Sequence, residues 1–150
     1  MILLDKIMDT VQRLIRLAGT NDPFRIAACL NIPVLYEDLG NIYGYYNMVL
    51  RMKQIHINQA LSEFEQTFTC SHELGHAVLH PKANTPFLRN NSLLSVDKLE
   101  KEANIFALDL RIGNDILLEH CHYTTSQLAN MLGYPEELIK LRVNEWMKFI

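Results

Sequence analysis

Cysteine is scarce in this sequence of 150 residues, which contains only Cys29, Cys70 and Cys121. No two of them form a Cys-x-x-Cys pair, so the sequence lacks the usual cysteine-based zinc motif. An odd number of isolated cysteines is also unlike the disulfide framework of a small secreted protein. We therefore expect three reduced thiols.

Long hydrophobic runs are also missing. The longest stretch without Asp, Glu, Lys or Arg spans residues 120–135, and it contains too many polar residues for a membrane span. At the N-terminus, the apolar residues 1–4 are followed at once by Asp5 and Lys6, which is unlike a secretory signal. These absences favour a cytoplasmic protein.

Positive charge is not in excess, since 14 Lys and Arg stand against 17 Asp and Glu, for a formal net charge of −3. The broad basic surface of a nucleic-acid-binding protein is therefore not expected. With 49% apolar and 21% charged residues, the composition is that of an ordinary globular protein. We found no repeats or linker-like stretches, and this length predicts one domain over residues 1–150.

The spacing of apolar residues predicts secondary structure along the chain. Helices are expected over residues 2–17, 23–30, 63–80, 97–112, 125–132 and 135–149. Stretches rich in aromatic and β-branched residues predict strands at 34–36, 43–50 and 54–58. The prediction is an α+β fold, mainly helical, with a small three-stranded sheet. Its parts are N-terminal helices and sheet (1–60), helices that carry the candidate metal ligands (61–112) and C-terminal helices (113–150).

The motif of highest information is His72-Glu73-Leu74-Gly75-His76. On a helix, residues four apart share one face, so the two imidazoles can converge on one metal ion. Glu73 lies about 100° round the helix, where a carboxylate flanks the ion and can deprotonate a water molecule. The motif therefore predicts metal-assisted hydrolysis.

A catalytic zinc usually takes three protein ligands, so one more is needed. His80 continues the four-residue spacing, but it lies about 12 Å along a straight helix from His72, too far to share one ion. The remaining candidates are the acids at the start of the next predicted helix: Asp97, Glu100 and Glu102.

Two segments together carry a family resemblance: residues 68–80, which contain the motif, and residues 100–107, which read Glu-Lys-Glu-Ala-Asn-Ile-Phe-Ala. They resemble the ImmA/IrrE family of bacterial and phage metallopeptidases, most closely the ImmA branch encoded by mobile elements. The resemblance implies a zincin-like fold and a zinc endopeptidase that cleaves a helix-turn-helix repressor. Residue by residue, it implies His72, His76 and Glu102 as zinc ligands and Glu73 as the catalytic base.

Glu102 also lies only about 26 positions beyond His76, so an antiparallel helix could present its carboxylate to the ion. Glu100 is its competitor, two residues away and roughly on the opposite face of that helix. For the substrate, an extended peptide could add to an exposed strand such as residues 54–58.

The C-terminal segment favours a partner other than nucleic acid. Residues 125–139 have the apolar rhythm of a helix-turn-helix, but the basic residues from Thr124 onward are matched by acidic ones, so a basic face is not expected. The alternative to a peptidase is a non-catalytic regulator whose zinc is structural and whose C-terminal helices bind a protein or DNA. Glu73 favours the enzyme, because a structural site needs no base.

Overall fold

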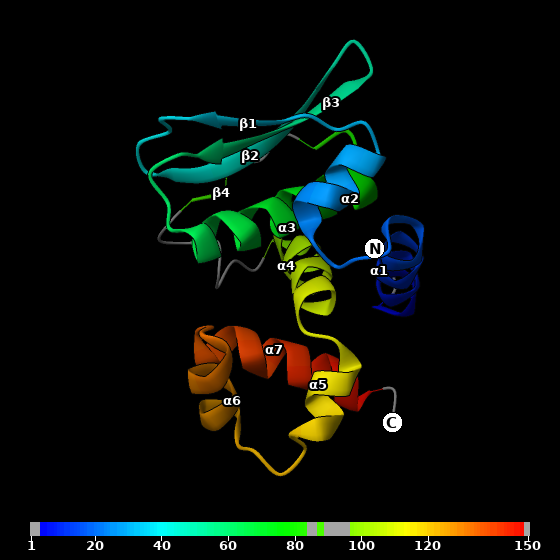
Figure 1. The fold of residues 1–150 in the computed structure, drawn as a ribbon, viewed down its shortest axis with the longest axis vertical. Coiled ribbons are helices and arrows are strands. Elements are labelled where there is room, and N and C mark those ends of the chain that lie inside the picture. The colour runs from blue at the N-terminus through cyan, green and yellow to red at the C-terminus, as the bar shows by residue number, and fades with distance from the viewer. Residues whose placement is uncertain (1–3, 84–86, 89–96, 149–150) are drawn as a thin grey trace. The chain divides into compact units, whose positions relative to one another are not determined.

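A computed structural model describes residues 4–83, 87–88 and 97–148 (Figure 1). The chain divides into two compact units, Met1–Arg111 and Ile112–Ile150. The boundary falls one residue from the predicted division at 112/113. That the whole chain forms one metallopeptidase domain stays a prediction. Among the described residues, no helix has both the length and the apolar character needed to cross a membrane.

The first unit combines helices with one mixed sheet. Its elements are α1 (Leu4–Ala18), α2 (Pro23–Cys29), β1 (Val34–Glu37), β2 (Ile42–Val49), β3 (Met52–Asn58), α3 (Glu63–Leu79), β4 (Phe87–Leu88) and α4 (Lys98–Arg111). The strand order is β1-β3-β2-β4, with β1 parallel to β3 and the other two pairs antiparallel. This confirms the predicted α+β class and all three predicted strands. The two-residue strand β4 was not predicted, because so short a segment has no recognisable period.

Strand β3 lies inside the sheet, hydrogen-bonded to β1 on one edge and to β2 on the other. Both edges of this strand are thus occupied, and the suggestion that a peptide adds to residues 54–58 was wrong. Strand pleating puts Ile55 and Ile57 on one face and His56 on the other. The two isoleucines are fully buried, and β3 and β2 both pack against α3.

Helix α3 is the central element of the first unit. It begins after a capping box in which Ser62 and Glu65 satisfy each other's backbone N–H groups, and it ends at Leu79, one residue before its C-cap His80. All residues from Phe68 to Ala77 are buried, as expected for a helix covered on every side. Its neighbours are α2, the sheet and α4, and Figure 1 shows α3 crossing beneath the strands.

Gly44 of β2 marks the closest approach of the sheet to α3. A Cβ atom added there would lie 2.5 Å from the backbone oxygen of His56 and 2.7 Å from Cγ2 of Thr69. The carbonyl belongs to the neighbouring strand and cannot move aside without disturbing the sheet. We expect Gly44→Ala to lower the free energy of unfolding by about 2 kcal/mol or more, as overpacking does. A urea denaturation midpoint equal to that of the wild type would contradict this.

The second unit consists of α5 (Asn114–Glu119), α6 (Thr125–Leu132) and α7 (Glu136–Met147). Helix α6 begins at the predicted residue, after the N-cap Thr124, whereas the short helix α5 was not predicted. Arg142 is buried, where its guanidinium donates hydrogen bonds to the carbonyl of Ile112 and to Oδ1 of Asn114 and lies 3.6 Å from Glu145. This arginine is therefore committed to the interior of the unit and is not available to a phosphate.

Candidate metal centre

The two histidines of the motif meet one carboxylate from α4. Nε2 of His72 lies 3.0 Å from Oε2 of Glu100, and Nε2 of His76 lies 2.9 Å from Oε1 of the same residue. The imidazoles are fully buried and Glu100 nearly so. Helix α3 thus supplies two ring nitrogens that could bind a metal, on one face and one turn apart. Helix α4 supplies both oxygens of one carboxylate opposite them.

The charge state of this cluster follows from its packing. Burial lowers the pKa of His72, which favours a neutral imidazole with a lone pair for a metal. Burial alone would raise the pKa of Glu100, but its hydrogen bonds with His72 and His76 outweigh that effect and lower the pKa to about 2. Near neutral pH the cluster therefore offers a neutral imidazole at His72 and an anionic carboxylate at Glu100.

The two competing glutamates of α4 have different partners. Glu100 faces His72 and His76, whereas Oε1 of Glu102 lies 2.8 Å from Nε2 of His80. The sequence correctly placed these two acids on different faces of their helix, but the geometry favours Glu100 as the third donor where the resemblance implied Glu102. Asp97, the third acid considered, is exposed just before α4.

Packing between the helices decides which face of α4 meets the histidines. A Cβ atom on Gly75 would lie 3.1–3.2 Å from three atoms of Phe106, so the absence of a side chain lets α4 approach α3 closely. Glu102 is one turn from Phe106 and shares its side of the helix. Because the side of α4 with Glu102 and Phe106 packs along Gly75, the side with Glu100 and Asn104 faces His72.

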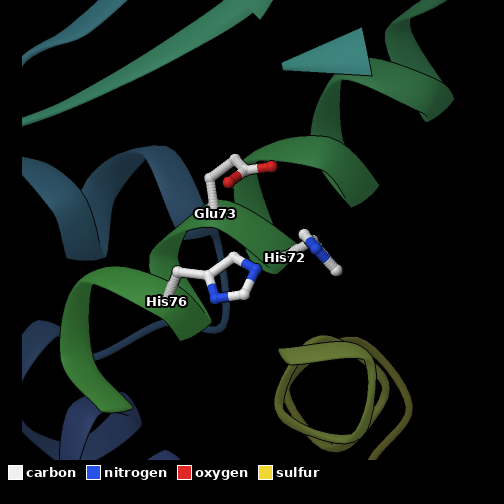
Figure 2. A group of neighbouring side chains, drawn as sticks. All are labelled: His72, Glu73 and His76. Carbon is white, nitrogen blue, oxygen red and sulfur yellow. The ribbon is translucent and has the colours of Figure 1, made fainter. Parts of the chain in front are cut away.

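Glu73 differs from the other acids of the centre. Its carboxylate is fully buried, and neither oxygen has a hydrogen-bond partner among the residues that the structure describes. Burial raises the pKa of Glu73 well above its ordinary value, and the negative charge of Glu100 raises it further. One ligand atom from each of His72, Glu73 and His76 lies within 4.8 Å of the others, and Figure 2 shows these three side chains projecting from adjacent turns of α3.

Each motif histidine also has a partner at its other ring nitrogen. Nδ1 of His72 lies 2.8 Å from Oδ1 of Asn104, and Nδ1 of His76 lies 3.0 Å from Nδ1 of His80. Metal-binding histidines are commonly held this way, with the second nitrogen bonded to a neighbour. The sequence analysis missed Asn104, although its place four residues after Glu100 on the same helical face was a usable signal.

These residues fit a divalent metal. Two imidazole nitrogens and a carboxylate are the donor set of a catalytic zinc site, with a fourth position left open. Four tetrahedral ligands at about 2.1 Å lie about 3.4 Å apart, a few tenths of an ångström beyond the His–Glu100 contacts. An outward shift of that size would bring the two His–Glu100 contacts to the spacing of metal ligands.

This arrangement is that of a zincin-like metallopeptidase: one helix carries two histidines one turn apart with a glutamate beside the first, and the next helix supplies an acid. The peptidase M78 family model, described as the IrrE N-terminal-like domain, matches residues 27–144. The chain therefore belongs to this family, and the resemblance to ImmA/IrrE proteins is confirmed.

Two relatives place the chain more closely. "Uncharacterized immunity region protein 2" of Bacillus phage phi105 is 44% identical over 135 residues, which cover 88% of this chain and 85% of the relative. "Metallopeptidase ImmA" of Bacillus subtilis (strain 168) is 36% identical over 141 residues, which cover 90% of this chain and 82% of the relative. Both likenesses extend along most of either chain, so they include the metal centre and at least part of the second unit.

Proposed function

We propose that this protein is a zinc-dependent endopeptidase that cleaves a helix-turn-helix repressor and so relieves repression of a mobile element or phage-like operon. The observation that carries the proposal is Glu73, a fully buried carboxylate without a hydrogen-bond partner in the described residues, beside two histidines that converge on Glu100. A purely structural metal site has no use for such a group, because burying an unpartnered carboxyl costs stability.

The proposed ligands of the zinc are His72, His76 and Glu100. Their three side chains already converge, and all three are buried. Glu102, which the resemblance implied, faces His80 and takes a different role. When bound, the zinc would supply Lewis-acid chemistry, polarising the scissile carbonyl and lowering the pKa of a water molecule toward 7.

The proposed base is Glu73. Its carboxylate would accept a proton from the attacking water and later return it to the amine that leaves. Burial, and then the charge of Glu100, raises the pKa of Glu73 in the metal-free protein, and the positive charge of a bound ion would act in the opposite direction. His72 and His76 stay neutral in this scheme and hold their lone pairs toward the ion.

The proposal that the substrate is a repressor rests on the similarity of this chain to its two relatives. One relative is named as an immunity region protein of a phage and the other as a metallopeptidase. Taken together, these names suggest a peptidase that acts in phage immunity, and we propose a repressor as its substrate. No metal beyond zinc and no nucleic-acid partner is needed for this function.

The direct test is to incubate the purified protein with the helix-turn-helix repressor encoded beside its gene. We expect the repressor to be cut, the cutting to stop when a chelator removes the metal, and zinc to restore it. Circular dichroism of the chelated sample is the control, because a core of this size should stay folded without metal. An intact repressor after incubation with the zinc-loaded protein would favour the non-catalytic regulator instead.

A further inference from the structure

A line of three side chains leads away from the proposed zinc ligand His76. Nδ1 of His76 lies 3.0 Å from Nδ1 of His80, and Nε2 of His80 lies 2.8 Å from Oε1 of Glu102. All three residues are at least nine-tenths buried, at 1%, 8% and 7% exposure. Two imidazoles and a carboxylate therefore form a continuous chain from the metal centre, along α3 to its C-cap His80, and across to α4.

Only one arrangement of protons suits this chain when His76 binds a metal. Its Nε2 then gives up a lone pair to the ion, so its hydrogen must sit on Nδ1. That hydrogen is donated to Nδ1 of His80, which accepts only if the hydrogen of His80 sits on Nε2. Nε2 of His80 in turn donates to the carboxylate of Glu102, which has no hydrogen of its own and can only accept.

We propose that Glu102 and His80 are positioning residues that fix the tautomer and the orientation of His76 and thereby raise the affinity of the protein for zinc. The proposal rests on the proposed function in so far as His76 binds the metal through Nε2. In this proposal Glu102 acts on the metal site through the rings of His80 and His76. This explains why an acid that does not reach the ion is buried against a histidine. His80, too far along the helix to share the ion with His72, acts as the link.

The charge on Glu102 has a second effect on the ligand. A carboxylate that accepts the hydrogen bond of His80 makes Nδ1 of that ring a stronger acceptor, which in turn pulls on the Nδ1 hydrogen of His76 and makes its Nε2 a better donor to a metal. His72 has a neutral partner, Oδ1 of Asn104, in the corresponding place. The two ligands are therefore held unequally, and we expect His76 to be the stronger donor.

Zinc affinity measured by competition with a chelator is the first test. Loss of a partner that orients a ligand typically weakens metal binding about 10- to 100-fold, and we expect this of His80→Ala and Glu102→Ala. Because both act through one chain, the double variant should bind zinc no more weakly than the weaker single variant. Glu102→Gln keeps an oxygen that accepts from His80 but loses the negative charge, so its zinc affinity should lie between that of Glu102→Ala and that of the wild type.

The sheet offers a matched control. Oε1 of Glu37 lies 2.6 Å from Nδ1 of His56, which is again a carboxylate against a buried imidazole, but on the face of β3 opposite the one that packs against α3. We expect Glu37→Ala to leave zinc affinity unchanged. Unfolding of each metal-free variant in urea shows how much of any loss of affinity comes from a weakened fold.

Nitrogen-15 spectra of the histidines in the zinc-loaded protein give a second, independent reading. In the wild type, His80 should carry its hydrogen on Nε2 and His76 on Nδ1. The effect of Glu102 is read in the metal-free protein, where no bound ion fixes the hydrogen of His76: the wild type should keep the hydrogen of His80 on Nε2, and in Glu102→Ala the His80 signals should move toward the values of a ring that exchanges between its two tautomers. A merely structural role for Glu102 would leave the tautomer of His80 unchanged.

The outcomes separate this proposal from the proposed function. If His80→Ala and Glu102→Ala bind zinc as the wild type does while His72→Ala does not, the positioning role is wrong and the metal site stands. If Glu102→Ala loses zinc entirely while His80→Ala keeps it, Glu102 is itself a ligand and the proposal fails. If even His72→Ala and His76→Ala retain zinc, the metal centre proposed above is wrong.

Discussion

The variant Glu73→Gln is expected to bind zinc as tightly as the wild type and to leave the repressor uncut. Glutamine has nearly the shape of glutamate, but it cannot take a proton from water. Loss of a general base typically slows a reaction about 10²- to 10⁴-fold, and we expect cleavage to slow by that factor. Because His72, His76 and Glu100 are untouched, metal content after dialysis should be unchanged. Rate and metal content are measured on the same preparation.

A control for this variant is available on the same helix. Glu63→Gln makes the same chemical change at an exposed position in the first turn of α3, and it should alter neither metal content nor cleavage. The variant Glu73→Gln should still associate with the repressor in a pull-down. If it relieved repression in cells as well as the wild type does, proteolysis at this site would not be the mechanism, and a regulator would be the better description.

The second large effect is expected from Glu100→Ala. This change removes both oxygens that face His72 and His76 and leaves the two imidazoles as the only proposed ligands. Two protein ligands hold zinc poorly, so we expect the metal to be lost on dialysis, beyond the about 10- to 100-fold weakening that loss of an orienting partner causes. Elemental analysis of the dialysed protein measures this directly.

The neighbouring variant Glu102→Ala is the matched comparison, since it removes the same side chain two residues along the same helix. It should retain zinc, though more weakly. Full metal content in Glu100→Ala together with complete loss in Glu102→Ala would overturn the ligand set proposed here and restore the one that the family resemblance implied.

Much of the fold could be predicted because its signals are local. Helix α3 begins at Glu63, where the spacing of apolar residues predicted its start, and Pro81 follows soon after its end. The three main strands are rich in aromatic and β-branched residues and are separated by short turns. By contrast, β4 and α5 have two and six residues, too few for a hydrophobic period to identify them.

The order of the strands was not available from local patterns. Nothing in residues 52–58 distinguishes a central strand from an edge strand, and β3 became central only because β1 pairs with it in parallel from the far side. This pairing closes both edges of β3 and removes it as a site for an added peptide. Contacts between distant parts of the chain determine the order of the strands, and a window of a few residues contains no information on such contacts.

In the metal centre, too, helical spacing could predict some features and only tertiary packing determined the others. The sequence by itself determined the pairing of His72 with His76 and the place of Glu73 beside them, because helical geometry sets the relation of residues one and four positions apart. Which acid of α4 meets the pair depends on the rotation of one helix against another. Only the tertiary structure decided this, through the packing of Phe106 on Gly75, which turns Glu100 toward the histidines and leaves Glu102 facing His80.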